Sequence, residues 1–137
     1  MGCHPSRRPL VALMERGEIR LVDLDPVRGA EANKRRPAVL VSNDGANAMA
    51  ASLGRGVVTV VPVTSNVERV YPFQVFISAP ESGLDRDSKA QAEQVRSLAV
   101  ERIGQAIGRL TPLDLERLDD ALRLHLRSEE RRVGKEC

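Results

Sequence analysis

The stretch VVTVVPV, at residues 57–63, is the strongest β-strand signal in the chain. Every position except Pro62 carries a β-branched side chain, and such side chains favour extended backbone. Proline has no amide hydrogen to give to a β-ladder, so Pro62 predicts either an edge strand or a bulge at that point. The stretch therefore predicts a fold that is built around a sheet.

Further strands are predicted on both sides of this stretch. Short apolar or alternating runs bounded by turn residues are typical of strands. They occur at residues 18–25 (EIRLVDLD), 37–42 (PAVLVS), 73–77 (FQVFI) and 105–110 (QAIGRL). Residues 88–98 stay ambiguous, because their periodicity fits either a helix or a strand.

The segments between the strands carry turn and loop signals. A polar loop is predicted at residues 26–35 and a turn at residues 83–87 (GLDRD). Residues 43–56 (NDGANAMAASLGRG) are rich in Gly and Ala and begin with a turn signal. We therefore expect the segment to end as a mobile loop, and a single helical turn is compatible with its sequence.

A helix is predicted near the end of the chain. Thr111 is a suitable N-cap, and Pro112 fits the first helical position. The expected apolar face consists of Leu115, Leu118, Leu122 and His125 or Leu126. Roughly five to seven short strands and one terminal helix predict a mainly β fold of the α+β class, a small β-barrel with a helix packed on it.

Both ends of the chain are interpreted as foreign to this fold. The chain has 137 residues, enough for one domain. Residues 127–137 (RSEERRVGKEC) are highly charged and resemble the in-frame translation of a sequencing adapter. Residues 1–13 are interpreted as a doubtful N-terminal extension, because a strand-like pattern begins soon after Met14. The domain is therefore expected at residues 14–126.

The charge of the chain is mostly an effect of its ends. The formal net charge is +2, but residues 127–137 carry four cations and three carboxylates, and residues 1–13 carry two arginines. Residues 14–126 are thus left with a net charge of −1, so only a local patch could support nucleic-acid binding. The two cysteines, Cys3 and Cys137, lie in the doubtful ends. No apolar run is long enough for a membrane span, and a cytoplasmic protein is expected.

Two sequence features could bind a phosphate. A local basic cluster leads into the strand at residues 37–42; its members are Arg28, Lys34, Arg35 and Arg36, with Glu31 among them. Such a loop either clamps phosphates or is an ordinary solvated loop. Because a residue before proline is held extended, Arg36 is expected at the mouth of a strand. Thr64 and Ser65 could donate to a phosphate oxygen, or they form an ordinary strand-end turn.

Other nuclease chemistries find little support in the sequence. His4 lies in the doubtful extension and His125 lies on the predicted helix, so a mechanism with two histidines is excluded. The sequence has no HExxH, CxxC, Walker A or GxGxxG motif. Asp23 and Asp25 share one face of a strand end, where ordinary solvation is a simpler interpretation than a Mg²⁺ site.

Three blocks, in this order, resemble the MazF/PemK family of toxin endoribonucleases. They are RGEIRLVDLDPVRGAEANKRRPAVLVSN at residues 16–43, VPVTSN at residues 61–66 and LDRDSKAQAEQVRSLAVERI at residues 84–103. Residues 29–40 follow the pattern G-x-E-x-x-x-x-R-P-x-x-V, except that Leu40 stands at its last position. The resemblance implies an SH3-like barrel with a C-terminal helix, as in MazF/CcdB-like toxins, and a two-fold homodimer.

The resemblance also implies an activity that needs no metal or cofactor. Toxins of this type cut single-stranded RNA at short sequences by attack of the 2′-OH, which leaves 2′,3′-cyclic phosphate and 5′-OH ends. The matching catalytic positions are Arg36 and Thr64. The positions expected to bind RNA are Gly29, Glu31, Lys34, Asn43, Ser65 and Gln94. Since arginine stays protonated, Arg36 is expected to stabilise charge, and Glu31 and Glu93 are both candidates for the proton acceptor.

The implied protein partner is a MazE-like antitoxin whose acidic, flexible segment covers the groove. Two other functions are compatible with this fold. CcdB-like toxins share the barrel and inhibit DNA gyrase, but their gyrase-contacting end carries a Trp, and this chain has none. The third possibility is a non-catalytic RNA-binding or scaffold module. Substitution of Arg36 separates these functions, because it should abolish cleavage but leave the partner choice of a pure binder largely intact.

Overall fold

The computed structural model describes residues 14–24 and 35–127. The strands in these residues are β1 (Glu18–Val22), β2 (Arg36–Leu40), β3 (Val57–Thr64), β4 (Gln74–Ile77), β5 (Ser88–Gln91), β6 (Arg96–Ala99) and β7 (Ile103–Arg109). The helices are α1 (Asp44–Leu53), α2 (Ala79–Ser82) and α3 (Pro112–Leu126), with short 3₁₀ turns at η4 (Ala92–Gln94) and η5 (Val100–Arg102). The predicted strands are confirmed with shifted ends. The ambiguous segment 88–98 contains β5, η4 and most of β6.

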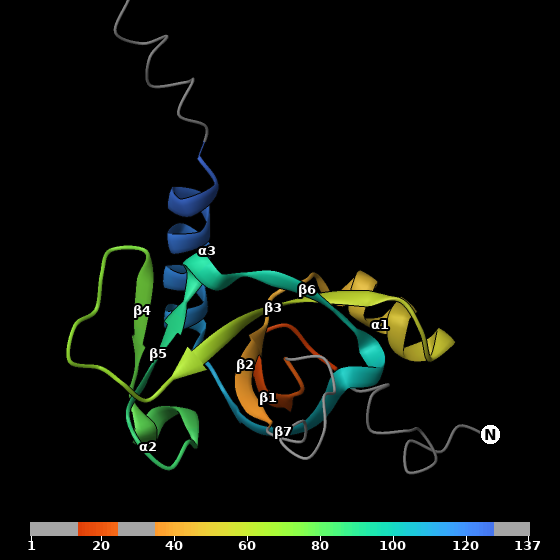
Figure 1. The fold of residues 1–137 in the computed structure, drawn as a ribbon, viewed down its shortest axis with the longest axis horizontal. Helices are drawn as coiled ribbons and strands as arrows, with labels where there is room; N and C mark the ends of the chain where they lie inside the picture. Colours follow the sequence, from red (N-terminus) through yellow and green to blue (C-terminus); the bar gives the residue numbers. More distant parts are fainter. Residues whose placement is uncertain (1–13, 25–34, 128–137) are drawn as a thin grey trace, which may run out of the picture.

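All strand pairs in the described residues are antiparallel, in the order β4-β5-β3-β2-β1-β7. β6 also pairs with β3 and completes a strongly curved sheet. Figure 1 shows β1, β2 and β7 coiled beneath β3 and β6, with α3 beside β4 and β5 and α1 at the other end. The predicted mainly β fold with a C-terminal helix is therefore confirmed.

Strand β3 lies in the middle of the sheet, so the prediction of an edge strand is wrong. One side of β3 pairs with β2, and the other side pairs first with β6 and then with β5. Residues 57–60 pair with β6, and Val63 and Thr64 pair with β5. Pro62 lies between the residues that pair with β6 and those that pair with β5, at the point where η4 separates these two strands. The edge of β3 that faces them has no partner there among the described strands, so the missing amide hydrogen of Pro62 leaves no ladder hydrogen bond unmade on that edge.

Alternate residues of β2 and β3 face two separate cores. Ala38, Leu40, Val58 and Val60 belong to the core inside the curved sheet, together with residues of α1. Val39, Val61 and Val63 belong to the core between the sheet and α3; this second core also contains Ile77, Leu118 and Ala121. Because both faces of the sheet are buried, these strands read as nearly continuous apolar runs in the sequence.

Residues 44–53 form a helix, so the prediction of a mobile loop is wrong. The Asn43 side chain accepts a hydrogen bond from the amide of Ala46 at 2.8 Å and caps the helix N-terminus. Gly54 ends the helix with a left-handed backbone, at a φ of 69°. Ala50 and Ala51 are buried in the inner core, so the alanines that suggested a flexible loop form the packing face of α1.

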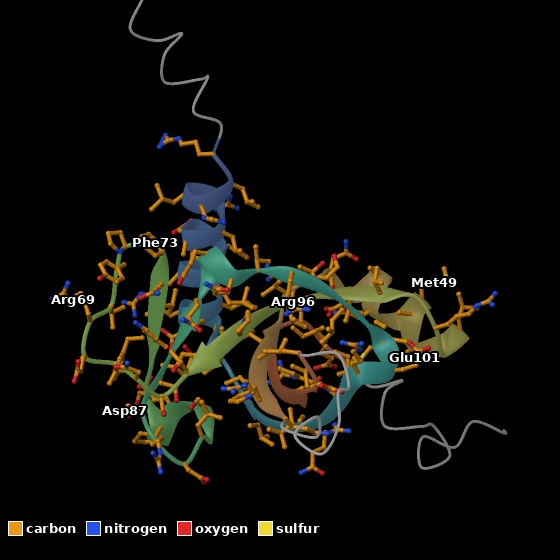
Figure 2. All side chains as sticks on the ribbon, viewed as in Figure 1. Met49, Arg69, Phe73, Asp87, Arg96 and Glu101 are labelled. Carbon is orange, nitrogen blue, oxygen red and sulfur yellow. The ribbon has the colours of Figure 1, made fainter. Side chains whose placement is uncertain are left out.

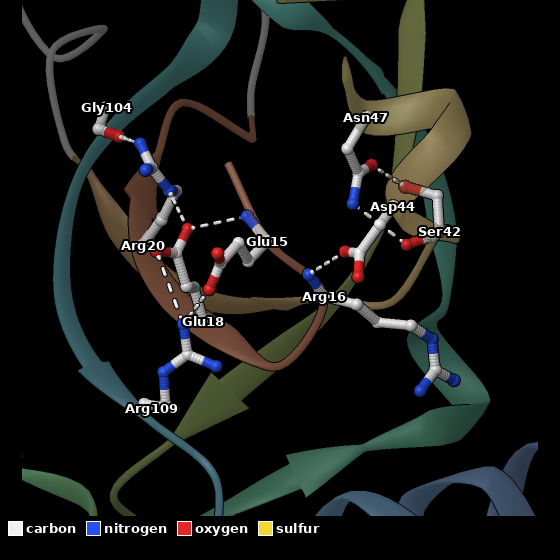
Figure 3. A network of polar contacts seen from close by, with 9 residues as sticks. All are labelled: Glu15, Arg16, Glu18, Arg20, Ser42, Asp44, Asn47, Gly104 and Arg109. Atoms are coloured by element: carbon white, nitrogen blue, oxygen red, sulfur yellow. Dashed lines mark hydrogen bonds and ion pairs between the residues drawn. The ribbon is translucent and has the colours of Figure 1, made fainter. Parts of the chain in front are cut away.

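A polar network fixes α1 and β1 to the rest of the fold (Figure 3). Asn47 is 0% exposed; it donates to the carbonyl of Ser42 at 2.9 Å and accepts from the Ser42 hydroxyl at 2.5 Å. The amide of Arg16 donates to Asp44 Oδ1 at 2.7 Å. Arg20, which is buried, donates to Glu18 at 2.9 Å and to the Gly104 carbonyl at 2.8 Å. These bonds satisfy buried polar groups and hold the β1–β7 end of the sheet in place.

Helix α3 begins as predicted, with the Thr111 hydroxyl accepting from the amide of Asp114 at 3.1 Å. Leu118 and Ala121 are buried against the sheet, with Leu115 and Leu122 partly buried beside them. The predicted apolar face is wrong in the last turn, where His125 and Leu126 are exposed. The helix extends beyond the sheet at that end. Within the described ranges, no helix is long and apolar enough to cross a membrane.

Candidate active site

A groove of about 650 Å³ opens where β2 begins and β3 ends. Its walls also include residues from the turn before β5, from β5 itself, from η4, from β6 and from β7. Its polar and charged lining residues are Arg36, Thr64, Ser65, Asp85, Arg86, Ser88, Gln91, Gln94 and Arg96. The groove therefore gathers side chains from segments that are far apart in the sequence.

The strand register brings Arg36 and Thr64 to the same place. In the antiparallel pair of β2 and β3, Ala38 lies opposite Pro62. Extending this register by two residues points Arg36 toward Thr64, and both residues line the groove. Residues two apart on a strand share a face. That face carries Ala38 and Leu40 into the inner core. Arg36 and Thr64 therefore lie at the edge of the inner core, where it opens into the groove and polar side chains can contact a ligand.

The Thr64 hydroxyl is oriented by the turn that follows it. Its oxygen accepts a hydrogen bond from the amide of Asn66 at 3.2 Å. A hydroxyl that accepts one hydrogen bond still has its own hydrogen to donate. Thr64 is half-buried and lines the groove. It can therefore donate to an oxygen atom placed in the groove.

The groove carries excess positive charge. Its lining includes Arg36, Arg86 and Arg96 but a single carboxylate, that of Asp85. Across the described part of the chain, none of these arginines takes part in an ion pair. The positive charge is thus confined to the groove, and the net charge of the chain does not show it. Such a local patch favours an anionic ligand such as a phosphate chain. Among the same residues, no cluster of His, Cys, Asp or Glu could hold a metal ion.

Four of the eight predicted site residues meet in the groove: Arg36, Thr64, Ser65 and Gln94. Asn43 does not line the groove, and its side chain caps α1. The other predicted residues, Gly29, Glu31 and Lys34, lie outside the described residues. Glu93 does not line the groove; its Oε2 accepts a hydrogen bond from Gln74 at 2.9 Å.

Sequence reasoning missed Arg86, Arg96 and Gln91 as groove residues. Arg86 looked like part of an ordinary turn, and Arg96 lies in a segment of ambiguous periodicity. Arg86 lies between Asp85 and Asp87, and Arg96 has no basic neighbour, so no local excess of positive charge marks either arginine. They reach the groove only because β5 and β6 pair with the same strand, β3, which is a long-range fact.

The sequence predicts that Asn43 contacts a ligand, the structure shows that it caps α1, and substitutions can separate these two roles. Asn43→Ala removes the cap of α1 and is expected to cost about 1 kcal/mol of unfolding free energy. Asn43→Ser keeps a capping oxygen and should restore that stability in urea unfolding. Because Asn43 does not line the groove, we expect the serine variant to keep whatever activity the groove has. A serine variant of normal stability that has lost this activity would instead assign Asn43 to ligand contact, as the sequence predicts.

Comparison with known proteins places the chain among toxins. Residues 15–126 match the family described as PemK-like, MazF-like toxin of type II toxin-antitoxin system. Over 114 residues the chain is 64% identical to endoribonuclease MazF9 of Mycobacterium tuberculosis, covering 83% of this chain and 97% of that protein. A match of 57 residues to the probable endoribonuclease MazF1 of the same organism is 72% identical and covers 42% of this chain and 61% of MazF1.

Solved structures share the fold. An endoribonuclease in complex with its cognate antitoxin, from a mycobacterial species, is 23% identical with a TM-score of 0.65, covering 82% of this chain and 94% of that one. MazF from Deinococcus radiodurans is 24% identical with a TM-score of 0.60, covering 82% of this chain and 96% of that one. At this level of identity the likeness is one of fold.

Proposed function

Since the chain belongs to the PemK-like, MazF-like toxins of type II toxin-antitoxin systems, we propose that it is the endoribonuclease of such a pair. Its substrate is single-stranded RNA, cut at short sequences without a metal or cofactor. The observation that carries this proposal is that Arg36 and Thr64 line the same groove, whose charged lining consists of three arginines and one carboxylate.

The proposed reaction is an in-line displacement at phosphorus. The ribose 2′-oxygen forms a bond to phosphorus while it loses its proton, and the bond from phosphorus to the 5′-oxygen breaks as that oxygen gains a proton. Negative charge builds on the non-bridging oxygens. Arg36 stabilises this charge with a guanidinium that stays protonated, and Thr64 donates a hydrogen bond to the same group. The products are a 2′,3′-cyclic phosphate and a 5′-OH.

The proton of the 2′-OH needs an acceptor other than Arg36. Glu31 and Glu93 are the two candidates from the sequence. One oxygen of Glu93 is engaged by Gln74, and Glu93 is not part of the groove lining. We therefore favour Glu31, which precedes Arg36 by five positions in the sequence. Gly29, Lys34, Ser65 and Gln94 complete the proposed RNA-binding set.

We further propose that the protein acts as a two-fold homodimer in the cytoplasm and that a MazE-like antitoxin inhibits it. The excess of arginine in the groove would attract an acidic, flexible segment of that antitoxin as well as RNA. A segment that folds on binding would then block access to Arg36 and Thr64. This inhibition requires no change in the geometry of the site.

The test is to incubate the full chain with a long RNA of mixed sequence in the presence of EDTA. We expect discrete cuts whose upstream fragments end in a 2′,3′-cyclic phosphate and whose downstream fragments begin with a 5′-OH. The absence of cutting by folded protein across several RNAs would overturn the endoribonuclease proposal. It would then favour a CcdB-like gyrase inhibitor or a non-catalytic RNA-binding module with the same fold.

The contribution of the Thr64 hydroxyl can be measured with two variants. Thr64→Val keeps the shape but removes the donor, and a hydrogen bond to a charged group contributes about 1.5–3 kcal/mol. We expect kcat for RNA cleavage to fall by roughly 10- to 100-fold. Thr64→Ser keeps the hydroxyl and should retain most of the rate. Equal rates for the valine and serine variants, with equal stability, would remove Thr64 from the mechanism.

A further inference from the structure

The aromatic side chains of this protein gather outside its main cores. The chain has only Tyr71, Phe73 and Phe76, and no Trp. Tyr71 and Phe73 stack with ring centroids 5.3 Å apart and ring planes within 7° of parallel. Tyr71 is 41% exposed and Phe73 is half-buried. The pair lies outside both cores, which are built from Val, Leu, Ile, Ala and Met14.

Two cations flank this pair. The Arg69 guanidinium carbon and the Lys89 Nζ each lie 5.9 Å from the centroid of the Tyr71 ring. Lys89 is only 8% exposed, and its Nζ donates to the Arg69 carbonyl at 2.5 Å. Within residues 14–24 and 35–127, neither cation forms an ion pair with a carboxylate. The pair therefore offers an aromatic face beside positive charge that no described carboxylate neutralises.

The aromatic pair is connected to the candidate active site through Lys89. Thr64 on β3 lies directly opposite Lys89 on β5, and Lys89 lies opposite Phe76 on β4. Opposite residues of an antiparallel pair have Cβ atoms about 4.5–5.5 Å apart on the same face of the sheet. Lys89 thus stands between the Thr64 hydroxyl and the Tyr71 ring. Figure 2 shows Arg69 and Phe73 on the segment that leads into β4, far from Met49 and Glu101.

We propose that Tyr71 and Phe73 form a stacking subsite for a base of the RNA that flanks the cleaved bond, with Lys89 and Arg69 binding its phosphate. This inference rests on the proposed function and names a further part of the same substrate site. Proteins recognise single-stranded RNA by stacking splayed bases on aromatic rings and arginine planes. Lys89 lies opposite Thr64 and its Nζ lies near the ring of Tyr71, in the segment before β4, so one RNA strand could reach both the reacting groups and the rings.

RNA fits this surface better than an acidic peptide does. Carboxylates would satisfy Arg69 and Lys89 but would leave the stacked ring faces without a flat partner. A nucleotide supplies both a flat base and an anionic phosphate. Because stacking binds substrate and transition state equally, the subsite should affect KM and leave kcat nearly unchanged.

The first test compares Tyr71→Leu and Tyr71→Phe in RNA cleavage. Loss of one stacking contact should raise KM by about tenfold in Tyr71→Leu. Tyr71→Phe keeps the ring and should recover most of the affinity. Arg55→Ala serves as the control, because Arg55 is exposed at the opposite end of β3. A KM for Tyr71→Leu equal to that of the unaltered protein would overturn the subsite while the cleavage activity itself stands.

The second test does not depend on cleavage. Tyr71 is the single tyrosine, so tyrosine-selective isotope labelling gives NMR ring signals from this position alone. A short single-stranded RNA of mixed sequence, with 2′-O-methyl sugars that have no hydroxyl to attack, should shift these signals, and Lys89→Gln should weaken the effect. Unchanged ring signals at saturating RNA would overturn the proposal. Signals moved by a poly-glutamate peptide but not by the oligonucleotide would assign the surface to an acidic protein segment and overturn the proposal equally.

Discussion

Replacing Arg36 with alanine is expected to lower kcat for RNA cleavage by about 10²–10³-fold, the usual loss when one preorganised donor to a developing negative charge is removed. Arg36 is exposed at the start of β2, so the substitution should leave the fold intact. Arg36→Lys keeps the charge but loses the planar guanidinium that can donate two hydrogen bonds at once. Its rate should lie between that of the unaltered protein and that of Arg36→Ala. Initial rates on a defined RNA, with unfolding curves for each variant, provide the measurement.

Arg55→Ala is the matched control for charge. It removes an exposed arginine at the opposite end of β3, outside the groove lining. Its cleavage rate should match that of the unaltered protein. If Arg36→Ala and Arg55→Ala lowered the rate equally, the effect would come from overall charge, and the assignment of Arg36 to the reacting phosphate would be wrong.

Leu118→Ala should destabilise the protein by about 2–5 kcal/mol, which is a large part of the stability of a small domain. Leu118 is fully buried in the core between α3 and the sheet, together with Val39, Val61 and Ile77. Shortening the side chain removes apolar contacts and leaves a cavity that the rigid sheet cannot close. Urea unfolding followed by circular dichroism measures the difference.

Leu126→Ala is the control for this substitution. Leu126 lies on the same helix but is 67% exposed, so the change should be within about 0.5 kcal/mol. A larger loss for Leu126→Ala than for Leu118→Ala would show that α3 is held by its outer face. The description of the second core would then be wrong.

The sequence predicts those parts of the fold that depend on local signals. The β-branched run of β3, the short apolar runs of its neighbours and the Thr111–Pro112 start of α3 each carry their own evidence. The candidate groove also follows in part, because Arg36 and Thr64 stand at the ends of two recognisable strands. Their meeting was expected from the family resemblance, and the β2–β3 register explains it physically.

Other features depend on tertiary packing, which local patterns do not encode. The alanines of α1 are interpreted as loop residues from the sequence alone, because the sequence does not show that Ala50 and Ala51 pack as small side chains in the inner core. Pro62 predicts an edge strand, because the sequence does not show that β5 and β6 both pair with β3 and leave Pro62 unpaired between them. Arg96 reaches the groove only through long-range pairing.

The central claim is that the RNA's own 2′-OH attacks the phosphate held by Arg36 and Thr64. The most direct measurement is cleavage, in EDTA, of an RNA that carries one 2′-deoxy sugar on the 5′ side of a mapped cut. The account predicts that this single change abolishes cutting at that bond, while cuts elsewhere and binding of the RNA persist. Continued cutting at the modified bond would contradict it, because the attacking group would then be water.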